Sequence, residues 1–110
     1  MTTEPMTGLA QGRLTPRGGC RVQCRRGSSD LGPDLALRLV DVWPDGATVL
    51  VREPLPEGQE VSLVLEGPGN CHPVRHAGQV ARAAADAAGG HLAVVEFRER
   101  IPRAELMRLT

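Results

Sequence analysis

The chain has 110 residues, enough for one small domain, and 41% of them are apolar. Aromatic residues make up only 2%, so the core must be built from Val, Leu and Ala. A formal net charge of zero argues against a general binder of polyanions such as RNA or DNA. No apolar run approaches the ~20 residues of a membrane span, and the N-terminus does not resemble a signal peptide. We therefore expect a cytoplasmic protein without a membrane segment.

The first 18 residues are polar and rich in Gly, Thr and Pro, which predicts a flexible N-terminal arm followed by one domain over residues 19–110. Five arginines lie between Glu4 and Asp30 with no acid among them: Arg13, Arg17, Arg21, Arg25 and Arg26. All basic residues of the chain are Arg, for which codon usage in a GC-rich genome is one explanation. Arginine forks nonetheless suit phosphates and guanine edges, and their planes stack on bases.

Apolar residues then alternate with polar ones, the pattern of half-buried strands. In the first strand Cys20, Val22 and Cys24 share one face, and in the second Leu35 and Leu39 share a face with Leu37. Turn clusters separate six predicted strands, which cover residues 20–26, 35–42, 47–52, 59–66, 74–82 and 91–99. The alanine-rich run 83–88 precedes two glycines and predicts a hairpin rather than a helix.

The number and spacing of these strands predict an all-β fold, a six-stranded antiparallel barrel. We favour closure into a barrel because it protects the edges of so small a sheet. Residues 101–110 predict a short C-terminal helix, with Pro102 in its first turn and with Leu106 and Leu109 on the barrel wall.

One corner of this fold has an unusual sequence, Asp41-Val-Trp-Pro-Asp-Gly46, with the only tryptophan of the chain, Trp43, between two strands. Over residues 13–109 the chain resembles the PilZ domain family. That family has an RxxxR motif before its first strand and a [DN]xSxxG corner between its second and third strands. Trp43 stands at the family's Ser position, and Val94 stands where the family usually has Gly.

Two registers fit the RxxxR motif, Arg13 with Arg17 and Arg21 with Arg25. We favour Arg13 and Arg17 because they precede the first strand, as in the family. Arg21 and Arg25 fall inside that strand and would add to the same patch.

The resemblance implies a ligand, the bacterial second messenger cyclic di-GMP. Arg13 and Arg17 would hold its phosphates and guanine Hoogsteen edges, and Asp41 would accept hydrogen bonds from guanine N1–H and amino groups. Gly46 would allow a tight turn where a side chain would collide. The expected protein is an effector that binds cyclic di-GMP and signals through an unidentified protein partner. The alternative is a degenerate PilZ adaptor that binds a protein and no nucleotide.

Trp43 has three interpretations. It fills the ligand cleft and abolishes binding, it stacks on a guanine in place of the family's polar contact, or it covers an apolar patch at the barrel rim with an arginine over its face. The sequence leaves all three open.

Other chemistries are weakly supported. A zinc site would need unsuitable spacings, and a catalytic triad has no supporting pattern, so we expect no metal and no enzyme. With few aromatic residues for base stacking, we also expect no nucleic-acid partner. His76 and His91 are expected at the surface. The candidate residues for zinc or catalysis are Cys20, Cys24, Cys71, His72, His76, Asp41, Asp45 and Asp86.

Overall fold

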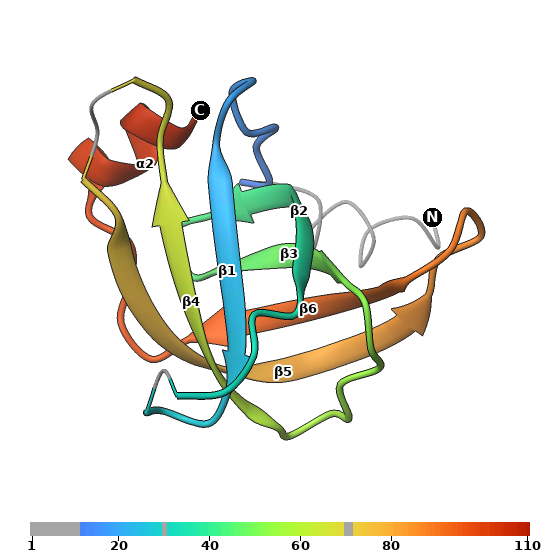
Figure 1. The fold of residues 1–110 in the computed structure, drawn as a ribbon. Coiled ribbons are helices and arrows are strands. Elements are labelled where there is room, and N and C mark those ends of the chain that lie inside the picture. Colours follow the sequence, from blue (N-terminus) through green and yellow to red (C-terminus); the bar gives the residue numbers. More distant parts are fainter. Residues whose placement is uncertain (1–11, 30, 70–71) are drawn as a thin grey trace, which may run out of the picture.

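A computed structural model describes residues 12–29, 31–69 and 72–110 of the chain. Six antiparallel strands form one sheet that curls into a nearly closed barrel, with one short helix at its end (Figure 1). The predicted fold class is confirmed. The elements are β1 (Arg21–Arg26), β2 (Ala36–Trp43), β3 (Gly46–Val51), β4 (Glu60–Glu66), β5 (Val74–Ala85), β6 (His91–Phe97) and α2 (Arg103–Leu109).

The strand order in the sheet is β1-β4-β5-β6-β3-β2. Its two end strands, β1 and β2, therefore face each other across a seam. Asp34 closes one end of this seam, because its Oδ1 accepts hydrogen bonds from the backbone N–H of Cys24 (2.9 Å) and of Ala36 (3.0 Å). Across the same end, the N–H of Leu35 donates to the carbonyl of Cys24 at 2.7 Å.

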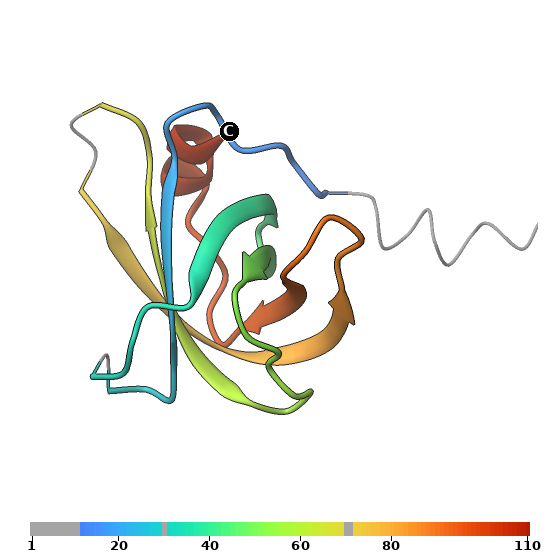
Figure 2. The same ribbon diagram turned by 45° about the vertical axis from the view of Figure 1, so that its right-hand side comes forward.

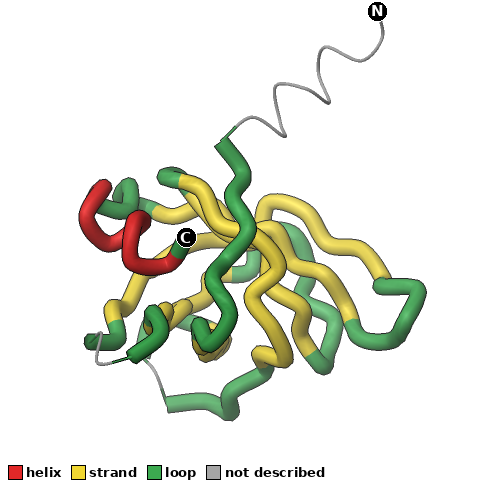
Figure 3. Tube along the Cα trace, turned by 90° about the horizontal axis from the view of Figure 1, so that it is seen from above, coloured by secondary structure: helices red, strands yellow, loops and turns green. Residues whose placement is uncertain are grey.

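The other end of the seam is covered by residues 12–20, which we call the strap. Leu14 pairs with Val42 on the free edge of β2, through N–H to carbonyl bonds of 2.8 and 3.0 Å in the two directions. Further on, the N–H of Arg17 donates to the carbonyl of Leu109 at 2.7 Å. The strap thus crosses the barrel between β2 and the end of α2 (Figures 2 and 3). Of the predicted flexible arm, residues 12–18 are described and are hydrogen-bonded to the barrel and α2 through Leu14 and Arg17, and residues 1–11 lie outside the described residues.

The barrel interior is filled almost entirely by aliphatic side chains, as the composition requires. Every strand contributes to this core, and the one phenylalanine, Phe97, is only partly buried against it. The inward residues of the first strand are those predicted. Cys24 is fully buried and Val22 is partly buried, as is Cys20, which directly precedes β1.

The predicted face of β2 is wrong at one position. Leu35 and Leu39 are buried, but Leu37 is 51% exposed. Register irregularities between Ala36 and Arg38 and between Leu39 and Asp41 reset the alternation, as β-bulges do. The second irregularity turns Val42 inward, whereas strict alternation from Leu39 would have put Asp41 inside.

Helix α2 packs on the barrel through Leu109, which is buried, and Leu106, which is partly buried, as predicted. Between the helix and β5, Nε2 of His76 and Oε2 of Glu105 share a hydrogen bond of 2.6 Å. The His76 ring also stacks on Phe97 with 4.9 Å between centroids. The side chain of His76 is only 9% exposed, so the predicted surface position is wrong for this histidine.

The hairpin after β5 begins later than the sequence indicates. Ala83, Ala84 and Ala85 continue the strand and pair with β6, and the turn covers residues 86–90. The partner strand thus decides the conformation of an alanine run that has little strand propensity of its own.

Candidate ligand-binding site at the β2–β3 corner

The corner between β2 and β3 is tied firmly to the end of β6. Trp43 and Gly46 are the last paired residues of the hairpin. The carbonyls of the two turn residues accept hydrogen bonds of 2.8 Å, that of Asp45 from the N–H of Phe97 and that of Pro44 from the N–H of Ile101. A corner held in this way offers its side chains at fixed positions, which reduces the entropy lost when a ligand binds.

Gly46 is required because two neighbours occupy the space above it. A Cβ atom at this position would collide with the carbonyl oxygen of Val95 and would lie 2.8 Å from Cζ2 of Trp43. The expected steric reason for glycine is therefore present, and the indole ring is one of the two groups that impose it.

The strap brings Arg13 to this corner. Its Nη1 lies 3.6 Å from Oδ2 of Asp41, and its Cζ lies 4.6 Å from the ring centroid of Trp43. Arg13 is next to Leu14, whose pairing with Val42 aligns the strap with the end of β2. Arginine over the indole face is a cation–π arrangement, the one that the third interpretation of Trp43 describes. The other two interpretations concern a bound ligand and stay predictions.

Two polar atoms are buried beside this corner with no hydrogen-bond partner among the described residues, Oδ1 of Asp41 and Oγ1 of Thr48. The two residues are paired across β2 and β3. A buried polar atom without a partner costs about 1–3 kcal/mol, so such atoms call for a physical explanation. Sequence reasoning missed Thr48, although it is the one polar side chain within the apolar run of β3.

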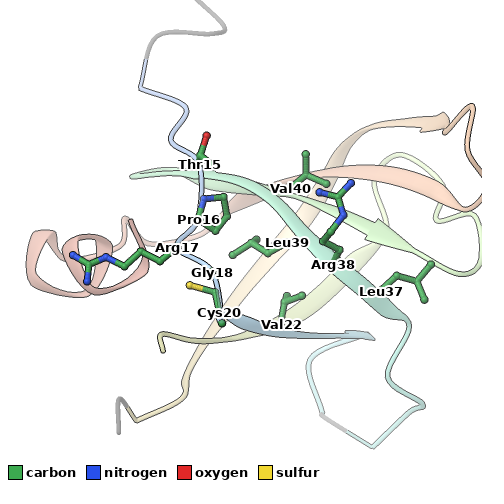
Figure 4. Close-up of a pocket in the computed structure, with 11 residues that line it drawn as sticks. Thr15, Pro16, Arg17, Gly18, Cys20, Val22, Leu37, Arg38, Leu39 and Val40 are labelled. Atoms are coloured by element: carbon green, nitrogen blue, oxygen red, sulfur yellow. The ribbon is translucent and has the colours of Figure 1, made fainter. Parts of the chain in front are cut away.

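The other predicted arginines are not brought to the corner. Arg17 is exposed, and its guanidinium extends toward α2 (Figure 4). Arg21 is exposed on β1, where it lies opposite Glu66 in the register of β1 with β4. Nε of Arg25 donates a hydrogen bond to the carbonyl of Gly32 at 2.9 Å, which holds this side chain against the loop after β1. Of the two motif registers, only the first places an arginine on Asp41.

A cavity of about 360 Å³ lies in the seam beneath the strap (Figure 4). Strap residues form one wall, and Val22 of β1 with the segment from Leu37 to Val40 of β2 forms the others. Arg17 and Arg38 are its charged lining residues, and the latter is exposed on β2.

The cysteines and histidines do not assemble a metal site in the described part of the chain. No group of three or more His, Cys, Asp or Glu side chains there is arranged to hold a metal ion. Burial raises the pKa of the Cys24 thiol to about 11, so it is a neutral core residue at physiological pH. The thiol of Cys20 is hydrogen-bonded to the carbonyl of Leu109 at 3.4 Å, and Cys71 lies outside the described residues.

Comparison with known protein families gives one clear result. The PilZ domain model matches residues 11–110, essentially the whole chain, and the protein therefore belongs to the PilZ domain family. Searches of curated proteins and of solved structures gave no significant match. Over the residues that the structure describes, no helix has the length and apolar character needed to cross a membrane.

Proposed function

We propose that the protein is a cytoplasmic effector that binds cyclic di-GMP at the β2–β3 corner and acts by contact with a protein partner rather than by catalysis. The observation that carries this proposal is the arrangement of Arg13 between Asp41 and Trp43 on a rigid hairpin. These residues supply a cation, a carboxylate and an aromatic face within contact distance of one another. PilZ domains generally bind this dinucleotide, which supports the choice of ligand.

The chemistry of the ligand suits these groups. Oδ1 of Asp41 has no partner among the described residues and can accept hydrogen bonds from guanine N1–H and N2–H. The guanidinium of Arg13 can hold a phosphate or the Hoogsteen edge of guanine through two parallel bonds. A guanine that displaces Arg13 from the indole would stack on Trp43, a contact worth ~1–3 kcal/mol in single-stranded nucleic-acid complexes.

The fluorescence of Trp43 provides a direct test, because it is the only tryptophan in the chain. We expect a saturable change on titration with cyclic di-GMP and none with GTP. Arg13→Ala and Asp41→Ala should each weaken binding at least about tenfold, the loss of one charge-assisted hydrogen bond. Arg52→Ala is the matched control, since this arginine is exposed just beyond the far end of β3. Equal binding by wild type and by both site variants would contradict the proposed site.

One observation favours a second function, that of an adaptor that binds a protein and no nucleotide. The indole ring of Trp43 already occupies the space over Gly46, and Arg13 already contacts both Trp43 and Asp41. On this hypothesis Trp43→Ser, which restores the family's residue, would create cyclic di-GMP binding that the wild type lacks. On the first hypothesis the same change would leave binding in place or weaken it through loss of stacking.

A further inference from the structure

A row of four side chains crosses the outer surface of the barrel next to the corner. The register pairs Asp41 of β2 with Thr48 of β3, Thr48 with Val94 of β6, and Val94 with Arg82 of β5. Side chains of directly paired residues lie on the same face of an antiparallel sheet. Because their sequence neighbours Ala47, Val49, Ala93 and Val95 fill the core, this row faces outward.

A cavity of about 210 Å³ is lined by three members of the row, Thr48, Val94 and Arg82. Its charged groups are Arg13 and Arg82, its one hydroxyl belongs to Thr48, and the rest of its lining is apolar: Ala83, Ala84, Leu92 and Val94. The volume is below the roughly 300–1,000 Å³ of pockets that enclose a drug-sized ligand. It therefore suits part of a cyclic dinucleotide, such as one base with its phosphate, and not the whole molecule.

Two polar atoms of the row have properties that point to a ligand. Thr48 is 4% exposed, and its Oγ1 has no hydrogen-bond partner in the described parts of the chain. Oδ1 of the adjacent Asp41 is also buried and also has no hydrogen-bond partner among the described residues. A hydroxyl can donate and accept, and a carboxylate accepts, so together they match the mixed hydrogen-bonding edge of a purine.

Arg82 supplies a second guanidinium group near Arg13 at the corner. Recognition of a dinucleotide phosphate would benefit from two guanidinium groups, and the strap directs Arg17 toward α2 instead. Arg82 is exposed on β5 and lines the same cavity as Arg13. The sequence did not identify Arg82 as a site residue, because it approaches Arg13 only through the pairing of β5, β6 and β3.

We propose that Arg82 and Thr48 extend the corner into a base-and-phosphate subsite for cyclic di-GMP, in which Arg82 rather than Arg17 is the partner of Arg13. The inference rests on the proposed function. One base lies against Leu92 and Val94, its edge bonds to Thr48 and Asp41, and the adjoining phosphate lies between the two arginines.

Calorimetric titration with cyclic di-GMP tests the subsite. We expect Arg82→Ala to weaken binding at least about tenfold, with partial recovery in Arg82→Lys, which keeps the charge but loses the fork. Thr48→Val keeps the shape, removes the hydroxyl and should weaken binding by a similar factor. Arg17→Ala and the control Arg52→Ala should change it less than about threefold, the effect of an exposed charge. Circular dichroism confirms that each variant is folded, and Arg82 is exposed, so its replacement leaves the core intact.

The outcomes separate the two proposals. If the wild type binds, Arg13→Ala loses affinity and Arg82→Ala does not, the subsite is wrong and the corner site stands. If Arg17→Ala loses affinity and Arg82→Ala does not, the assigned partner of Arg13 is wrong. If the wild type binds no cyclic di-GMP, the proposed function is wrong and the nucleotide subsite falls with it.

Discussion

Two pairs of buried polar side chains in this barrel are arranged in opposite ways. Beneath α2, His76 and Glu105 are buried as a hydrogen-bonded pair with 2.6 Å between their atoms. On the outer face of β2 and β3, Asp41 and Thr48 each bury an oxygen that has no partner in the described residues. A buried polar pair fixes the packing of two elements, whereas a buried atom without a partner lowers stability and leaves binding capacity unused. We infer that the first pair is structural, and we propose that the second belongs to a binding site.

The largest expected loss of stability comes from breaking the hydrogen bond between His76 and Glu105. Glu105→Ala leaves His76 buried without its partner, and we expect the free energy of unfolding to fall by about 2–3 kcal/mol. Urea denaturation followed by circular dichroism measures this. The double variant His76→Phe with Glu105→Leu replaces the pair by apolar groups and should be more stable than Glu105→Ala. A Glu105→Ala protein as stable as wild type would contradict a structural role for the pair.

A smaller effect on the free energy of unfolding is expected from Cys24, because burial raises the pKa of its thiol. Its pKa rises from 9.0 to about 11 in the folded protein because the thiolate is excluded from the core. Below pH 9 both states are protonated and the thiol has no pH-dependent effect, but between pH 9 and about 11 the unfolded state alone loses its proton. Stability should therefore fall with rising pH, by about 1 kcal/mol at pH 10 relative to pH 7.

Cys24→Ala provides the comparison for this pH dependence. The variant is less stable at every pH because it leaves a small cavity, but it lacks the thiol and should lose less stability between pH 7 and pH 10. Identical pH dependence in the two proteins would show that the thiol is not the group responsible.

Removal of the buried hydroxyl of Thr48 should raise the stability of the protein, whereas the changes above lower it. Thr48→Val removes a buried donor without a partner and keeps the side-chain shape, so we expect the free energy of unfolding to rise by about 1 kcal/mol. The matched control is Ser62→Ala. Ser62 is equally buried, but its Oγ accepts a hydrogen bond from Nε of Arg75 at 2.9 Å, so its loss should destabilise the protein. If both variants lose stability, the hydroxyl of Thr48 is hydrogen-bonded in the free protein and does not differ from that of Ser62.

The smallest effect on stability is expected for Arg13→Ala. Its contacts with Asp41 and Trp43 are partly exposed, and contacts of this kind contribute about 0.5–1 kcal/mol. Ligand affinity should fall far more than stability, and the tryptophan emission of the free protein should change because the cation leaves the indole face. A loss of stability above about 2 kcal/mol would indicate that Arg13 is a structural residue.

The sequence was sufficient to predict six strands, an aliphatic core and the C-terminal helix, because each depends on local alternation or on a short periodic run. It failed at Leu37, because the irregularities in β2 come from pairing with β3 rather than from the residues themselves. It also failed at His76, whose partner Glu105 lies 29 residues further along the chain on a different element.

The candidate site was only partly predictable for the same reason. Arg13, Asp41, Trp43 and Gly46 belong to two short motifs that the sequence shows, and the structure brings them together. The backbone of Arg17 is fixed by a hydrogen bond from its N–H to the carbonyl of Leu109, near the other end of the sequence. Thr48 and Arg82 reach the site through a register across three strands, and no local pattern encodes such a register.

Calorimetric titration of the wild-type protein is the direct test of the proposal that the corner and its outer face bind cyclic di-GMP. We expect saturable heat at micromolar or lower concentrations of cyclic di-GMP and none with GTP. The absence of binding up to several hundred micromolar ligand would contradict the proposal. Arg13, Trp43 and Asp41 would then form a closed surface contact, and the protein would act as an adaptor without a nucleotide.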